Sequence, residues 1–207
     1  MKHLKILIVG LITALSFSVG IAAPPIIKTA TNDVQKIYLS QIGVREATGH
    51  NDGKVVEMYL HNAGVSKGNP WCAAFVKWCY DKGRVGNYMT AAAASAHNVK
   101  NLCYNKNKLI KEPKPGDAFT LYFLKLGRIG HTGFYNKRLN STVYQSVEGN
   151  TNEAGSREGD GVYVKYRSFR GTYSISRWIP SLAINLPERV FLEPQRHEGT
   201  EWHKVAA

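Results

Sequence analysis

Cys72 is the residue of this sequence that is best placed for chemistry. It follows Asn69 and Pro70 at a predicted helix start, since Asn is a favoured N-cap and Pro suits the first helical position. In the first turn of a helix, unpaired N–H groups and the positive end of the helix dipole stabilise an anion. A thiolate is such an anion, and the pKa of a cysteine falls in this position. Cys72 is therefore a candidate nucleophile, and its own N–H is a candidate oxyanion donor.

A cysteine nucleophile needs a base, and His131 is the best-placed histidine. It lies in the middle of a predicted strand, and Gly130 and Gly133 beside it leave room for another element to approach. On this strand His131 shares a face with Ile129 and Tyr135, and we expect that face to point toward the helices. Its position alone fits a buried core histidine equally well.

The next predicted strand supplies a partner for His131. A hairpin whose turn is centred between Leu139 and Asn140 sets Glu148 directly opposite His131. A carboxylate there would hold the tautomer of the imidazole and stabilise its charged form. A slip of one residue would turn Glu148 to the other face of the sheet. Two positions further on, Asn150 is a candidate amide donor to the imidazole or the substrate, with a turn residue as the alternative.

The elements that must position these residues fall into two halves of the chain. The first half has helical periodicity, and the sequence predicts helices over residues 31–42, 51–63, 70–82 and 91–99. The second half has strand character, over residues 118–124, 128–136, 142–148, 161–168 and 173–179. Helices followed by strands indicate an α+β fold, with the helices packed on one face of an antiparallel sheet.

The two ends of the chain differ from its middle. A basic start, a mostly apolar run over residues 6–21 and small residues after it are typical of a secretory signal peptide. We expect residues 1–23 to be removed on export, with an uncleaved N-terminal anchor as the alternative. Residues 24–186 are predicted to form one catalytic domain, and residues 187–207 a polar tail. The protein is therefore expected to be secreted or periplasmic.

The composition narrows the set of partners. The chain has 207 residues and a net charge of +12, which fits either a solubilising surface or attraction to an anionic cell envelope. The lysines between residues 100 and 114 lack the aromatic pattern of a base-stacking surface, so we expect no nucleic acid partner. No histidines have the spacing of a metal site, and there is no phosphate-binding glycine loop. We expect no cofactor, no metal and a monomeric protein.

Three cysteines in an exported chain leave at least one thiol outside any internal disulfide. Cys72 and Cys79 are separated by about 10.5 Å along one predicted helix, which is too far for them to pair. Either Cys79 pairs with Cys103 and leaves Cys72 free, or Cys79 is a buried hydrophobic residue.

Four short motifs, taken in order, resemble the CHAP family (cysteine, histidine-dependent amidohydrolase/peptidase), a papain-like group. They are Asn-Pro-Trp-Cys-Ala-Ala-Phe-Val at 69–76, Lys-Pro-Gly-Asp at 114–117, Gly-His-Thr-Gly at 130–133 and Val-Glu-Gly-Asn-Thr-Asn at 147–152. The stretch over residues 43–53, which includes Glu46, is similar to the N-terminal motif of a CHAP subgroup. The likeness covers about residues 41–168.

The resemblance implies a papain-like fold and a peptidoglycan hydrolase that cleaves an amide bond of the wall peptide. The bond would be that of an N-acetylmuramoyl-L-alanine amidase or of an endopeptidase. The implied roles are nucleophile for Cys72, base for His131, orienting carboxylate for Glu148 and supporting amide for Asn150. Two other functions stay open: a catalytically silent wall-binding module, and an antibacterial effector with the same chemistry.

Substrate contacts are expected from residues near the nucleophile and from the loop that begins near residue 45. Trp71 is a candidate wall of the cleft, with core packing as the alternative. Asn69 is a candidate oxyanion partner, although capping the helix would occupy its side chain. Glu46 is the third candidate, through the motif that resembles the CHAP subgroup.

Overall fold

The structure is a computed structural model that describes residues 30–154 and 159–180. The predicted signal peptide (1–23) and the predicted tail (187–207) both lie outside the described residues. Within those described ranges, no helix is long and apolar enough to cross a membrane.

The helices come first in the described chain, as the periodicity predicts. They are α1 (Ala30–Ser40), α2 (Lys54–Asn62) and α3 (Cys72–Lys82). Where the sequence predicts one short helix over 91–99, the structure has two 3-10 turns, η1 (Ala93–Ala96) and η2 (Val99–Asn101). The helix α3 stops at Gly83, as predicted, but begins two residues later than Pro70.

The strands form one antiparallel sheet of seven strands in the order β2-β1-β7-β3-β4-β5-β6. They are β1 (Leu102–Asn105), β2 (Lys108–Leu109), β3 (Ala118–Phe123), β4 (Arg128–Arg138), β5 (Val143–Thr151), β6 (Gly161–Ser168) and β7 (Ser174–Ser176). A 3-10 turn, η3 (Leu124–Leu126), connects β3 to β4. The α+β fold is thus confirmed, and the hairpin β1–β2 is an addition that the sequence pattern does not predict.

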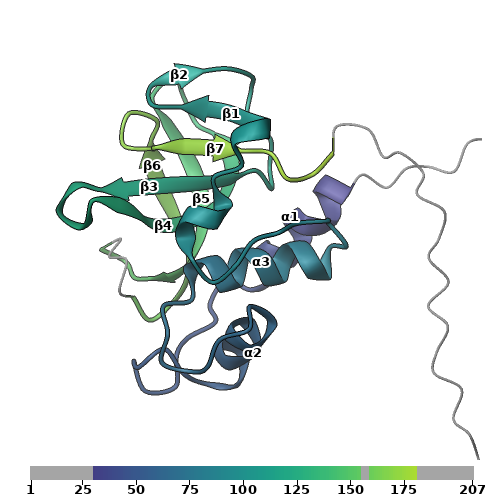
Figure 1. The fold of residues 1–207 in the computed structure, drawn as a ribbon, viewed down its shortest axis with the longest axis vertical. Coiled ribbons are helices and arrows are strands. Elements are labelled where there is room, and N and C mark those ends of the chain that lie inside the picture. The colour runs from purple at the N-terminus through teal and green to yellow at the C-terminus, as the bar shows by residue number, and fades with distance from the viewer. Residues whose placement is uncertain (1–29, 155–158, 181–207) are drawn as a thin grey trace, which may run out of the picture.

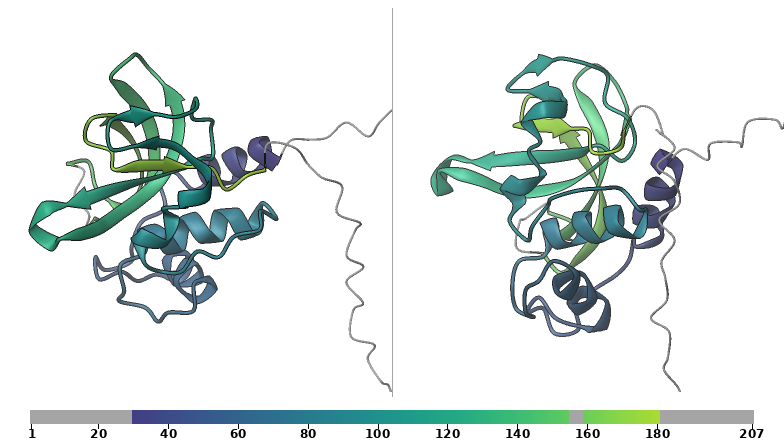
Figure 2. Two further views of the ribbon diagram at one scale, coloured as in Figure 1. Left: turned by 45° about the horizontal axis from the view of Figure 1, so that its top comes forward. Right: turned by 45° about the vertical axis from the view of Figure 1, so that its right-hand side comes forward.

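The sheet has a separate hydrophobic core on each side. On one side, α1 and α3 pack against it, and the ring of Tyr38 stacks on Phe134 with 4.6 Å between centroids. Figures 1 and 2 show α1 and α3 next to the sheet and α2 against α3 on the far side. A second cluster, which includes Phe119 and Tyr144, fills the other side. Successive residues of the central strands therefore serve different cores, as strand geometry requires.

Of the two alternatives for Cys79, the structure does not have the disulfide with Cys103. All three cysteines are free and buried. Cys79 belongs to the helix-side core, while Cys103 belongs to the second cluster, so the sheet separates them. The thiol of Cys103 donates to Asp117 Oδ2 at 3.3 Å. Cys79 is instead the buried hydrophobic residue of the alternative interpretation.

Candidate active site

Cys72 is the first residue of α3, so it lies in the first turn as predicted. The predicted cap is wrong, because the N-cap position is held by Trp71 and not by Asn69. Asn69 Nδ2 donates to the Ser66 carbonyl oxygen at 3.0 Å, which fixes its side chain in the preceding turn. The N–H of Trp71 donates to Asn150 Oδ1 at 3.1 Å, so a residue distant in sequence anchors the start of the helix.

His131 and Glu148 meet, although the predicted register of their strands is wrong. The observed pairs are Phe134 with Val147 and Tyr135 with Ser146, which is a shift of two residues from the predicted pairing. An even shift keeps Glu148 on the same face as His131. His131 Nε2 lies 2.8 Å from Glu148 Oε2, and both side chains are buried.

The shift has two local causes in the β4–β5 hairpin. Asn140 Oδ1 accepts hydrogen bonds from the N–H groups of Thr142 and Val143 at 2.9 Å each, so the turn lies later than predicted. The pairs next to the turn, Lys137 with Gln145 and Arg138 with Tyr144, are therefore three positions from the predicted register, and a bulge between Tyr135 and Lys137 reduces this shift to two. Turn chemistry and a bulge, rather than the hydrophobic pattern, decide the register here.

Gly133 provides the space that Glu148 needs. The observed register places Glu148 beside position 133 and diagonal to His131. A Cβ atom at Gly133 would lie 2.9 Å from Glu148 Cγ and 2.8 Å from Phe119 Cε1. The missing side chain therefore lets the carboxylate reach across to the imidazole.

We expected the imidazole of His131 to face the helices, but it lies on the other side of the sheet. Phe134 occupies the helix side of β4, while the ring of His131 lies 6.3 Å from that of Phe119, which belongs to the second cluster. The N-terminal end of α3 nevertheless reaches the imidazole, because α3 packs on β4. The Cys72 sulfur interacts with His131 and with the backbone N–H of Thr132.

Glu148 is held as a buried anion by groups that the sequence analysis missed. Arg167 on β6 donates two hydrogen bonds to it, from Nε to Oε1 at 2.7 Å and from Nη2 to Oε2 at 2.5 Å. The hydroxyl of Ser146 donates to Oε1 at 2.5 Å. Burial raises the pKa of Glu148, but Arg167 and His131 outweigh it and lower the pKa to about 2. The carboxylate is thus charged at any pH near neutrality.

The pKa shifts of Cys72 and His131 favour a thiolate beside an imidazolium. His131 Nε2 is committed to Glu148, and the buried Nδ1 makes no conventional hydrogen bond to any residue within 30–154 or 159–180. Nδ1 is therefore the nitrogen left for the thiol. Burial lowers the pKa of His131, but Cys72 and Glu148 raise it to about 9. Burial likewise raises the pKa of Cys72, yet His131 brings it below its usual value.

The side chain of Asn150 bonds to Trp71, Asn51 and Gly159 and not to the imidazole, which was one of the roles considered for it. Its side chain joins a closed ring of four residues at the start of α3. Asn150 accepts from Trp71 N–H, and its Nδ2 donates to Asn51 Oδ1 at 3.0 Å. Asn51 N–H donates to Glu46 Oε2 at 2.9 Å, and Trp71 Nε1 donates to Glu46 Oε1 at 2.8 Å. This ring ties the loop before α2 and the end of β5 to the residue that precedes Cys72.

The three residues expected to contact the substrate lie in three different places. Trp71 is completely buried in the helix-side core, so its side chain does not line a cleft. Glu46 lies on a separate polar cavity of about 430 Å³ together with Asn150. Asn69 does line the cleft at Cys72, which has a volume of about 140 Å³. Arg128 lies at the same cleft, a residue that the sequence analysis missed.

The described ranges contain no group of three or more His, Cys, Asp or Glu side chains that could hold a metal ion.

No protein-family model matches this sequence, and no curated protein matches it. Among solved structures, the chain is similar to NlpC1 from Trichomonas vaginalis, with a TM-score of 0.43 and 16% sequence identity. The match covers 73% of this chain and 45% of that chain, so the similarity spans less than half the length of NlpC1. A likeness at this level does not assign the chain to a family or to an activity.

Proposed function

We propose that this protein is a papain-like cysteine hydrolase of the CHAP type that cleaves an amide bond in the peptide part of peptidoglycan. The single observation that carries the proposal is the chain of contacts from Cys72 through His131 to Glu148, in which the pKa of the thiol is lowered and that of the imidazole is raised to about 9. A thiolate next to an imidazolium is the resting state that cysteine acyl transfer requires.

The geometry supports hydrolysis of the amide in two steps, formation of a thioester and its hydrolysis by water. In the first step, the Cys72 thiolate attacks the carbonyl carbon of the amide, and the oxyanion accepts a hydrogen bond from the Cys72 N–H. The His131 imidazolium gives its Nδ1 proton to the leaving nitrogen, which departs as an amine, and a thioester forms. In the second step, neutral His131 takes a proton from water, the hydroxide displaces the thiolate, and a carboxylic acid is released.

The cleft at Cys72 fits a peptide of small and acidic residues. Its lining includes Ala91, Ala92 and Ala93, whose methyl groups leave room for a small side chain. Arg128 lies at the same cleft, is exposed and makes no ion pair with any residue of the described ranges. A guanidinium whose charge is not paired within the described ranges favours a carboxylate on the substrate. Wall peptides combine alanine with acidic residues, so this lining supports peptidoglycan as the substrate.

Export to the cell wall is part of the same proposal. The basic composition, with a net charge of +12, supports attraction to an anionic envelope. A silent wall-binding module is the second candidate, but a binding module has no need of a thiolate beside a buried imidazole and carboxylate. An antibacterial effector would use the same chemistry, so it differs in target rather than in mechanism.

Digestion of purified sacculi, with mass spectrometry of the products, tests the proposal. The protein should release fragments with one new amino group per bond cut, on L-alanine for an amidase or on a stem or cross-bridge residue for an endopeptidase. Cys72→Ala should release none, while Cys79→Ala, on the same helix, should keep the activity. Intact sacculi after treatment with the unaltered protein, or equal digestion by Cys72→Ala, would contradict the proposal.

A further inference from the structure

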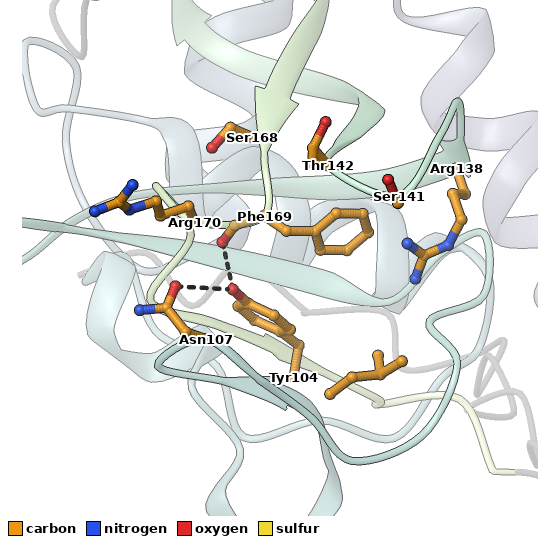
Figure 3. Close-up of a pocket in the computed structure, with 9 residues that line it drawn as sticks. Tyr104, Asn107, Arg138, Ser141, Thr142, Ser168, Phe169 and Arg170 are labelled. Carbon is orange, nitrogen blue, oxygen red and sulfur yellow. Dashed lines mark hydrogen bonds between the residues drawn. The ribbon is translucent and has the colours of Figure 1, made fainter.

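A further pocket lies on the side of the sheet away from the helices. It has a volume of about 580 Å³, within the range of small-ligand sites. The β1–β2 hairpin, the β4–β5 turn and the segment after β6 come together around it (Figure 3). It has no lining residue in common with the cleft at Cys72. Nothing in the proposed reaction uses this pocket.

The base of the pocket is apolar and fixed in place. Tyr104 and Phe169 are both buried, with 5.6 Å between their ring centroids. The hydroxyl of Tyr104 donates to the Phe169 carbonyl oxygen at 2.6 Å, as the dashed line in Figure 3 shows. Leu109, half exposed, extends this apolar surface toward solvent. The pocket therefore offers a rigid surface to the flat or C–H-rich face of a ligand.

The rim of the pocket is positively charged. Two arginines line it, Arg138 and Arg170, and no carboxylate does. Arg138 stacks on the Phe169 ring at 4.3 Å and forms hydrogen bonds of 2.8 and 3.0 Å with Glu112, so its charge is compensated. Arg170 is exposed and has no hydrogen bond or ion pair from its side chain to any described residue. Its guanidinium is free to pair with an anion.

Neutral polar groups complete the rim. The hydroxyls of Ser141, Thr142 and Ser168 and the amide of Asn107 belong to the lining. Such groups both donate and accept hydrogen bonds, so they suit a ligand with several hydroxyls at its edge. The pocket thus combines an aromatic base, a hydroxyl-rich rim and one uncompensated cation.

We propose that this pocket binds an acidic sugar residue, as a second site that holds the protein on an anionic glycan. A sugar ring has C–H groups on its faces, which fit against Tyr104, Phe169 and Leu109. Its hydroxyls and its N-acetyl or carboxylate groups project from the edge, where the polar rim and Arg170 lie. This site goes beyond the proposed hydrolase function and does not depend on it, because none of its residues takes part in the reaction.

A pair of sugars that differ in one acidic group tests the proposal. N-acetylmuramic acid and N-acetylglucosamine differ by the lactyl carboxylate, and binding of each is followed by amide chemical shifts of the purified protein. We expect the acidic sugar to shift the N–H signals of Asn107, Phe169 and Arg170 and to bind about fivefold more tightly than the neutral one. Arg170→Gln should reduce the affinity for the acidic sugar about fivefold and leave that for the neutral sugar unchanged.

Arg84→Gln is the matched control, because Arg84 is also exposed and lies beyond α3, outside this pocket. It should leave both affinities unchanged. Equal affinity for the two sugars, no binding of either, or an equal effect of Arg84→Gln would overturn the proposal. Shifts confined to Ala92 and Gly130 would also overturn it, because they would place the sugar in the Cys72 cleft. Digestion of sacculi is measured separately, because no residue of this pocket takes part in the reaction. Loss of sugar binding in Arg170→Gln therefore tests this pocket, while absence of digestion by the unaltered protein contradicts the hydrolase proposal.

Discussion

Glu148 lies diagonally across from His131, and its Oε2 is 2.8 Å from His131 Nε2. Two side chains directly opposite each other on paired strands are neighbours, and no other residue lies between them. A diagonal pair has to cross the position between its members, and here that position is Gly133, where a Cβ would lie 2.9 Å from Glu148 Cγ. The contact between base and carboxylate therefore depends on a glycine that carries no chemistry itself.

Replacing Gly133 by alanine should disrupt the site. The new methyl group would press on Glu148, on Phe119 and on the Val147 carbonyl oxygen, all within 3.0 Å. We expect a loss of about 1–3 kcal/mol in unfolding free energy, measured by urea denaturation. We also expect kcat to fall about 100-fold through displacement of the carboxylate. Gly86→Ala is the control, since a Cβ there meets nothing within 4 Å. Unchanged kcat in Gly133→Ala would contradict the role given to this glycine.

Glu148→Gln should move the alkaline limb of the pH–rate profile. Activity falls at high pH as His131 loses its proton, and the pKa of His131 is raised to about 9 by Cys72 and Glu148 against the effect of burial. Removing the negative charge at Glu148 destabilises the imidazolium, so the limb of kcat/KM should shift to lower pH. Glu112→Gln, which breaks an exposed ion pair with Arg138, should leave the limb in place. A limb that stays fixed in Glu148→Gln would show that the carboxylate does not tune the histidine.

Asn150→Ala should lower kcat without shifting that alkaline limb. Asn150 bonds to Trp71 N–H and Asn51 but not to the imidazole, so it positions the start of α3. Loss of this acceptor leaves a buried N–H unpaired, at a cost of about 1–3 kcal/mol in stability. Asn107→Ala is the control for backbone strain, because Asn107 and Asn150 both have a left-handed backbone, with φ of 68° and 54°. Alanine is strained at both positions, but only Asn150 bonds to Trp71 N–H. A shift of the limb like that of Glu148→Gln would mean that Asn150 acts on His131 directly.

Arg128→Gln should weaken the preference for acidic peptides. Arg128 lies at the Cys72 cleft and makes no ion pair within the described ranges, so its charge is available to the substrate. With a wall peptide that carries a free carboxylate, kcat/KM should fall about fivefold, mainly through KM. With the same peptide amidated, it should hardly change. Lys125→Gln, in the neighbouring turn, should affect neither substrate, and equal losses on both substrates would exclude the charge contact.

The sequence predicts the meeting of His131 and Glu148 better than it predicts how they meet. Strand alternation fixes which face each residue occupies, and that survives a register error of two residues. The register itself depends on the Asn140 turn and on a bulge, which have no periodic signal. Arg167 is missed for a related reason, because it pairs directly with Tyr144 and reaches Glu148 only along the strand.

The same limit applies to the start of α3. Asn69 and Pro70 have the local pattern of a helix start, but the first helical residue is Cys72. The contact that decides this comes from Asn150, which is 79 positions away in the sequence. Local capping patterns contain no information about such a partner. The short strands β1 and β2 are likewise too brief to show alternation.

The pH dependence of Cys72 alkylation by iodoacetamide tests the central claim most directly. In the folded protein Cys72 lines a cleft, while burial raises the pKa of Cys79 well above its usual value and that of Cys103 to about 12. The reaction therefore reports on Cys72, where His131 overcomes the effect of burial and lowers the pKa. We predict an inflection clearly below that of the urea-unfolded chain, which should lie at about 8.5. An inflection of the folded protein at or above the unfolded value would contradict a thiolate–imidazolium pair at this site.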